Sequence, residues 1–98
     1  MLSILSRHQV FYYKDHVIKA EKRSLFYTME YSLIIDDIKQ DQILGLHGIL
    51  VLHGTIKEGA IAKPVKIIMK QKILRTDFYC QVDGKMHKMS ELKFNDLL

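Results

Sequence analysis

Residues 25–35 alternate between two kinds of position, and this period of two constrains the fold more than any other feature of the chain. Every second residue is large and apolar, whereas Thr28, Glu30 and Ser32 lie among the positions between. Because successive side chains of a β-strand point to opposite faces, the pattern predicts a strand that buries one face. That face comprises Leu25, Tyr27, Met29, Tyr31, Leu33 and Ile35.

Further strands are predicted along the rest of the chain, separated by turns. Within a long apolar run, Gly45, Gly48 and Gly54 are read as bends that let one strand curl. The predicted elements are a polar turn at 36–41, a long bent strand at 43–56, a turn at 58–60 and a strand at 65–74.

Two hairpins are predicted, one near each end of the chain. Asp83-Gly84 suits a two-residue type I′ turn and joins residues 78–82 to residues 85–89. Near the N-terminus, residues 9–13 and 16–20 read as a second hairpin across Lys14-Asp15. A short helix over residues 15–23, capped by Asp15, is the alternative for part of this segment. A C-terminal helical turn over residues 90–98 is also predicted, with Ser90 as its N-cap.

This succession of short strands predicts an all-β fold, or a β-rich α+β fold, with one short C-terminal helical turn. We expect a small antiparallel barrel or sandwich. The chain has 98 residues, 48% of them hydrophobic and 27% charged, which is the balance of a folded globule. It has one proline and no linker-like stretch, so residues 1–98 are predicted to form a single domain.

The hairpin at Asp83-Gly84 predicts two opposed faces for the last three strands. Residues directly opposite each other point to the same side, so Tyr79 shares a side with Lys88. If Arg75-Thr76 forms the preceding turn, Lys72 lies opposite Tyr79 and shares that side. The predicted core face comprises Val65, Ile67, Met69, Ile73, Phe78, Cys80, Val82 and Met89. The other face is basic and comprises Lys66, Lys70, Lys72, Tyr79, Gln81 and Lys88, with Ile68 and Met86 among them and Arg75 beside it.

Charge points to an anionic partner for this basic face. The net charge is +4, and residues 57–93 carry nine basic and four acidic side chains. Such a face could track a phosphate backbone while Tyr79 stacks on a base. An acidic protein surface is an alternative partner, and plain solvation of a sheet is the simplest reading of the lysines.

No motif for catalysis, metal binding or a cofactor stands out. His47 and His53 are six residues apart, roughly 20 Å on a straight strand, which is too far for one metal ion. Glycine-rich phosphate loops and a calcium loop are missing. Cys80 opposite His87 is the only nucleophile–base candidate, and both residues are predicted on the core face. A metal-independent nuclease built from Arg75, Tyr79, His87 and Lys88 stays open as a third function.

The remaining expectations concern compartment and assembly. A single cysteine, Cys80, excludes an internal disulfide and favours a reducing compartment. Residues 1–7 are too short for a signal peptide, and the most apolar stretch, residues 43–53, is about half the length of a membrane-spanning helix. A cytoplasmic protein without a membrane partner is therefore expected. Adjacent aromatic residues at positions 11–13, together with Phe26, indicate a homo-oligomer or partner interface. We therefore expect a non-enzymatic module that binds nucleic acid or a nucleoprotein, with a protein–protein adaptor or inhibitor as the second interpretation.

Overall fold

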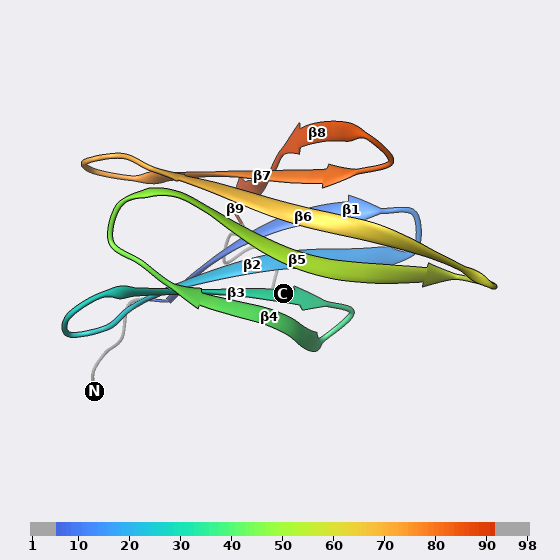
Figure 1. The fold of residues 1–98 in the computed structure, drawn as a ribbon, viewed down its shortest axis with the longest axis horizontal. Helices are drawn as coiled ribbons and strands as arrows, with labels where there is room; N and C mark the ends of the chain where they lie inside the picture. Colours follow the sequence, from blue (N-terminus) through green and yellow to red (C-terminus); the bar gives the residue numbers. More distant parts are fainter. Residues whose placement is uncertain (1–5, 92–98) are drawn as a thin grey trace.

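The computed structural model describes residues 6–91, which form nine strands in two antiparallel sheets (Figure 1). The five-stranded sheet has the order β4-β3-β2-β1-β9, and the four-stranded sheet has the order β5-β6-β7-β8. The all-β prediction is confirmed, with two sheets in place of a closed barrel. The strands are β1 (Ser6–Tyr13), β2 (His16–Ser24), β3 (Met29–Ile35), β4 (Ile38–Leu44), β5 (Gly48–Glu58), β6 (Ile61–Gln71), β7 (Thr76–Val82), β8 (Lys85–Lys88) and β9 (Ser90–Glu91).

The two ends of the sandwich are built differently. At one end, on the right in Figure 1, two-residue turns join β1 to β2, β3 to β4, β5 to β6 and β7 to β8. Asp83 and Gly84 have φ of 55° and 73°, as a type I′ turn requires. We call this the turn end. At the opposite end, called the loop end, residues 25–28, 45–47 and 72–75 make longer connections.

The core lies between the sheets and consists of the inward residues of both. On the five-stranded sheet, Ile18, Leu33 and Ile35 are buried, and Tyr31 meets Phe78 of β7 edge to face at 6.0 Å between ring centroids. The four-stranded sheet contributes Leu52, Ile56, Val65, Ile67, Met69, Phe78, Cys80 and Val82. Within residues 6–91 there is no helix of the length and apolarity that crossing a membrane requires.

Side chains of β4 close the seam between the two sheets. The register of β3 and β4 shifts at Leu33, which leaves Gln40 as an extra residue without a ladder partner. Its side-chain amide accepts a hydrogen bond from the Thr55 N–H at 2.7 Å and donates one to the Thr55 carbonyl at 3.0 Å. Asp41 Oδ2 also accepts from the His53 N–H at 2.8 Å. The edge of β5 is therefore hydrogen-bonded at His53 and Thr55 without a neighbouring strand.

A second cluster ties the sheets together at the turn end. Lys63 Nζ lies 2.8 Å from the Tyr13 hydroxyl, 3.2 Å from Asp83 and 3.2 Å from Glu58. The Tyr13 hydroxyl also donates to Asp83. The hydrogen bond from the Tyr13 hydroxyl, followed by that from Lys63, holds the pKa of Asp83 below its usual range. The hydrogen bond from Lys63 is the main cause of the lowered pKa of Glu58. These residues come from three different hairpins, so the cluster fixes how the hairpins pack.

Several predicted boundaries are wrong at the loop end. The strand predicted at residues 25–35 begins only at Met29, and residues 25–28 form a loop closed by the Leu25 N–H to the Thr28 carbonyl at 2.8 Å. The strand predicted at 43–56 is two strands, because the chain crosses from one sheet to the other at residues 45–47. The polar turn predicted at 36–41 is only Asp36-Asp37, and β4 begins at Ile38.

Predictions at the chain ends fared differently. The N-terminal hairpin across Lys14-Asp15 is confirmed, and the alternative helix at 15–23 is wrong because Asp15 lies in the turn and residues 16–23 belong to β2. Ser90 is not an N-cap, because Ser90 and Glu91 pair with Val10 and Gln9 as β9. The rest of the predicted helical turn, residues 92–98, lies outside the described residues.

Candidate nucleic-acid interface

The predicted hairpin of β7 and β8 is confirmed residue by residue. Tyr79 pairs with Lys88, and Gln81 pairs with Met86. The register of β6 on β7 differs from the prediction by four residues, because Tyr79 lies opposite Ile68 and not opposite Lys72. A shift by an even number leaves every side chain on its predicted face. The structure therefore brings Lys66, Lys70, Tyr79, Gln81 and Lys88 to one outer face.

The register shift moves the remaining candidates off the sheet. Lys72 and Arg75 lie in the connection between β6 and β7, not on a strand. Ile73, predicted in the core, is 98% exposed at the tip of that connection. The prediction failed there because a four-residue loop, residues 72–75, replaces the two-residue turn expected at Arg75-Thr76.

Four lysines form what we call the basic face, on the outer side of the four-stranded sheet: Lys57, Lys66, Lys70 and Lys88. All four are exposed, and within residues 6–91 none of them makes a salt bridge. Lys57 was missed in the sequence because the strand at 43–56 was expected to end before it. His53 lies exposed on the same face and pairs with Lys66. Because polar His53 follows apolar Leu52, the sequence could have predicted that His53 and the other odd-numbered residues of β5 face outward.

Tyr79 is half-buried within this face, and its ring is already occupied. Lys70 Nζ lies 5.0 Å from the ring centroid, which is the geometry of a cation–π contact. A base could stack on that side of the ring only after Lys70 moved away. The face as it stands therefore offers ammonium groups to a ligand rather than an open aromatic platform.

Asp77 is the one carboxylate on this face among the residues that the structure describes. Its Oδ2 lies 2.9 Å from Lys72 Nζ and its Oδ1 lies 3.3 Å from Arg75 Nε. The hydrogen bond from Lys72, followed by the charges of Arg75 and Lys72, holds the pKa of Asp77 below its usual range. Asp77 is thus ionised at neutral pH and neutralises two cations that would otherwise extend the basic face.

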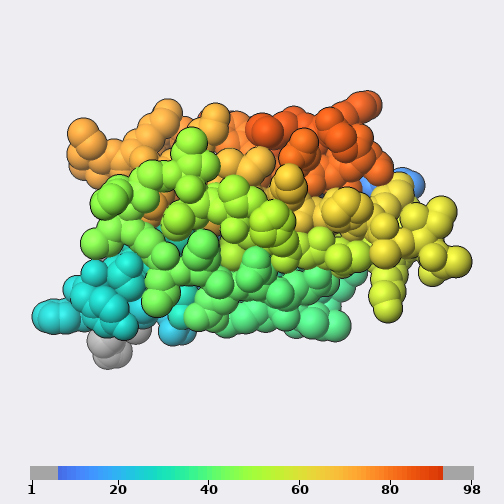
Figure 2. All heavy atoms as spheres, viewed as in Figure 1, coloured from blue at the N-terminus to red at the C-terminus, as the bar shows by residue number. Residues whose placement is uncertain are grey.

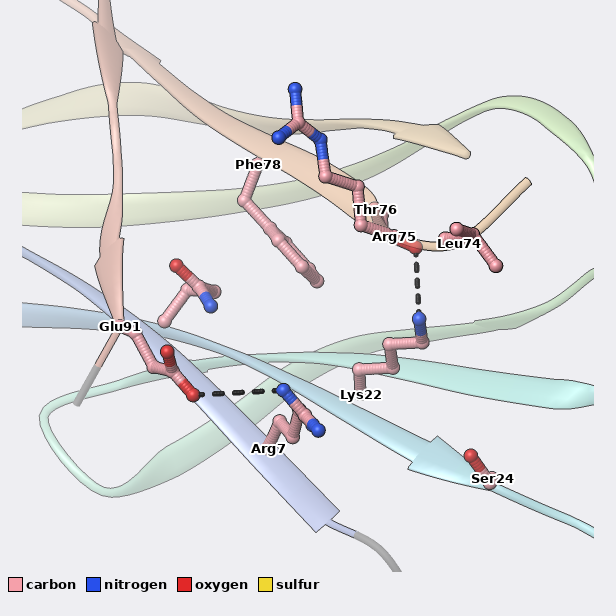
Figure 3. Close-up of a pocket in the computed structure, with 9 residues that line it drawn as sticks. Arg7, Lys22, Ser24, Leu74, Arg75, Thr76, Phe78 and Glu91 are labelled. Carbon is pink, nitrogen blue, oxygen red and sulfur yellow. Dashed lines mark hydrogen bonds and ion pairs between the residues drawn. The ribbon is translucent and has the colours of Figure 1, made fainter. Parts of the chain in front are cut away.

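A cationic pocket of about 350 Å³ opens between the sheets at the loop end (Figure 3). Arg7 and Lys22 enter it from the five-stranded sheet, whereas Arg75 lines its rim with the guanidinium turned away toward Asp77. Lys22 donates to the Thr76 hydroxyl at 3.0 Å, and Arg7 lies 3.9 Å from Glu91. Burial, together with the charge of Arg7, lowers the pKa of Lys22.

The sequence contained a signal for this pocket that was not used. In the N-terminal hairpin, Arg7 lies opposite Lys22, on the same side as the buried Ala20. Extending the alternation of inward and outward residues along these two strands would have placed both cations at inward positions near the strand ends. Because burying an unpaired charge in a core is costly, two inward cations indicate a solvent-filled site there. The remaining lining residues are Gln9, Ser24, Leu74, Thr76, Phe78 and Glu91.

The residues considered for catalysis do not converge. Cys80 is fully buried, and burial raises its pKa to about 12, so its thiol is protonated at neutral pH. His87, which pairs with Cys80 across the hairpin, stacks on Phe11 with the ring centroids 4.5 Å apart. Its side chain lies on the inner side of β8, opposite to that of Lys88. Arg75 is held by Asp77. Within residues 6–91, no three His, Cys, Asp or Glu side chains are grouped so that they could hold a metal ion.

The aromatic residues expected at an interface are dispersed. Phe11 packs inward, Tyr13 joins the turn-end cluster, and Tyr12 alone of the three is largely exposed. Phe26 projects from the loop end.

Comparison of the chain with protein-family models, with curated proteins and with solved structures finds no match. What the protein binds must therefore be inferred from its own surfaces.

Proposed function

We propose that this protein is a non-enzymatic, cytoplasmic binding module whose basic face docks on the phosphate backbone of single-stranded nucleic acid, free or within a nucleoprotein. The observation that supports this function is the set of four exposed lysines on one sheet face that make no salt bridge with any other residue of 6–91. The only carboxylate described on that face, Asp77, is already paired. A surface of this kind attracts polyanions and releases their counterions on binding.

The spacing of the lysines favours a polymer over a small anion. Lys66 and Lys70 are four residues apart on β6, which separates their backbones by roughly 13 Å. Lys88 lies two strands away from β6, roughly 10 Å across the sheet. Side chains this far apart contact separate phosphates along a strand, as proteins that bind single strands without sequence preference do.

Recognition is expected to be independent of sequence. The cation–π contact with Lys70 covers one side of the Tyr79 ring, and lysine makes point contacts with phosphates rather than the bidentate contacts that read bases. We therefore expect similar affinities for oligonucleotides of different sequence and a strong dependence on salt.

The test is fluorescence anisotropy of a labelled single-stranded oligonucleotide over a salt series. Four phosphate contacts predict a slope of about −2.8 for log affinity against log salt, or about 50-fold weaker binding on a fourfold rise in salt. Replacing Lys66 and Lys70 by glutamine should halve this slope to about −1.4.

A matched control separates the basic face from net charge. Lys39 and Lys85 are exposed elsewhere, so the pair Lys39→Gln and Lys85→Gln removes the same charge away from the face. This control should keep the parental slope. Absence of binding at low salt, or an equal loss in both double variants, would refute the proposal.

A further inference from the structure

Large apolar side chains project from all three connections of the loop end. Phe26 is completely exposed, Ile73 is 98% exposed and Leu74 is 96% exposed. Figure 2 shows the corresponding parts of the chain, coloured cyan and orange, projecting at the left end of the molecule, with the green connection between them. We call five residues the loop tips: Phe26, Tyr27, Leu46, Ile73 and Leu74.

The loops hold these side chains outward by their backbone. Residues 25–28 are closed by the Leu25 N–H to the Thr28 carbonyl at 2.8 Å, with Phe26 and Tyr27 between them. Residues 72–75 are closed in the same way, by the Lys72 N–H to the Arg75 carbonyl at 2.7 Å. Each closed loop presents its two central apolar residues at its apex, where they cover no part of the core.

The folding of a small sheet protein does not require such tips. At the turn end, the same kind of connection is made by polar or small residues such as Asp36-Asp37 and Asp83-Gly84. Exposed apolar residues are common singly, but a gathering of them on several loops at one end marks a binding surface.

Cations surround the tips. Lys72 and Arg75 flank Ile73 and Leu74 directly, and Lys22 and Arg23 precede the loop of Phe26. Segments 22–30, 44–49 and 70–77 together carry five basic and two acidic residues. Both acids are paired, because Glu30 lies 3.3 Å from Arg23 and Asp77 binds the pair described above.

We propose that the loop end docks on an anionic lipid bilayer. The loop tips enter the boundary between headgroups and acyl chains, and Lys22, Arg23, Lys72 and Arg75 meet lipid phosphates above them. The pocket behind the tips, into which Arg7 and Lys22 project beside Glu91, is open at the same end and has room for one phosphate-bearing headgroup. Apolar side chains ringed by Lys and Arg are the pattern of proteins that bind the membrane interface.

The shape and charge of the loop end favour a bilayer over a second copy of the chain. Separate projecting tips leave gaps against a rigid protein surface, whereas lipid fills the space between them. Two copies facing each other would also bring like charges together. The loop end adjoins the basic face at Asp77, Lys72 and Arg75, but the loop tips and the four lysines of the basic face are changed by separate variants, so either proposal can fail without the other.

The experiment is co-sedimentation of the full chain with vesicles of phosphatidylcholine, with and without phosphatidylserine. Stronger partition onto vesicles with phosphatidylserine is expected, by about fivefold for each basic residue at the surface. The double variant Ile73→Ser with Leu74→Ser should bind these vesicles on the order of 30-fold more weakly, because partial burial of two aliphatic side chains is lost.

The matched control replaces two aliphatic side chains of the same size at the turn end. Ile38 and Ile61 are 66% and 64% exposed, and the pair Ile38→Ser with Ile61→Ser should bind vesicles as the parent does. Equal loss in both double variants would overturn the proposal, as would no binding to anionic vesicles. A dimer in light scattering that the Ile73→Ser and Leu74→Ser changes dissociate would assign the loop end to a second copy instead.

Discussion

Replacing Asp77 by asparagine should strengthen binding to nucleic acid, and a gain of affinity is harder to obtain by accident than a loss. Asp77 lies on the outer face of β7 and holds Lys72 and Arg75 at 2.9 and 3.3 Å. Asparagine has nearly the same shape and keeps one oxygen to accept a hydrogen bond, so the loop at residues 72–75 should persist. What changes is the charge, because two cations lose their counter-ion beside the basic face.

The size of the gain follows from counting contacts. Each new phosphate contact steepens the salt slope by about 0.7 and multiplies the affinity near 0.1 M salt by about fivefold. If Lys72 and Arg75 both reach the strand, the slope should change from about −2.8 to about −4.2, and binding near 0.1 M salt should be about 25-fold tighter. If only one reaches it, the corresponding values are about −3.5 and fivefold.

The assay is the same anisotropy titration, with thermal unfolding as a check that the variant is folded. Asp15→Asn is the matched control, because Asp15 is exposed in the turn between β1 and β2 and its loss changes net charge equally at the turn end. The control should bind as the parent does. Unchanged or weaker binding by folded Asp77→Asn would show that the basic face does not include its neighbours, and the reasoning from contacts would fail.

Two further predictions concern stability. A Cβ on Gly54 would lie 2.7 Å from Leu33 Cδ2 and 2.9 Å from Gln40 Oε1. Gly54→Ala should therefore lower the free energy of unfolding, measured by urea titration, by about 1–3 kcal/mol. An unchanged urea midpoint would show that Leu33 and Gln40 move aside without loss of stability. At the turn end, His16 Nδ1–H donates to Asp36 at 2.6 Å and is the main cause of the lowered pKa of that carboxyl. Asp36→Asn should cost about 1 kcal/mol at pH 7. The pKa of Asp36 in the folded state lies below its unfolded value of about 3.9. The difference in unfolding free energy between the parent and Asp36→Asn should therefore disappear as the pH falls through the folded pKa. A difference that does not change with pH would contradict this.

The features that the sequence predicted correctly are the ones that local chemistry determines. Asp83-Gly84 specifies a two-residue turn, and such a turn sets the register of both strands that it joins. Tyr79 opposite Lys88 could therefore be predicted without knowing the fold. The face of Lys66 and Lys70 also survived an error in register, because only an odd shift exchanges the two faces of a strand.

The features that the sequence did not predict depend on tertiary position. Leu46 and Leu52 each precede a His-Gly pair in the apolar run 43–56, so nothing local distinguishes the exposed Leu46 from the buried Leu52. The polar run of β4 was read as a turn because nothing in it shows that Gln40 and Asp41 would bond to the edge of a strand in the other sheet. The alternation of residues 25–35 likewise continued through Tyr27, although the chain leaves the sheet there.

The division between a turn end and a loop end bears on how function is distributed. Four two-residue turns determine the register of the hairpins that they join, so the sequences of residues 25–28, 45–47 and 72–75 are free from that requirement. Apolar tips and cations in those connections therefore call for an explanation outside folding. Asp77 stands where the loop end meets the basic face, and its two partners belong to both surfaces. In Asp77→Asn, Lys72 and Arg75 are free to contact either nucleic acid or lipid phosphates, so these two ligands should compete more strongly in the variant than in the parent.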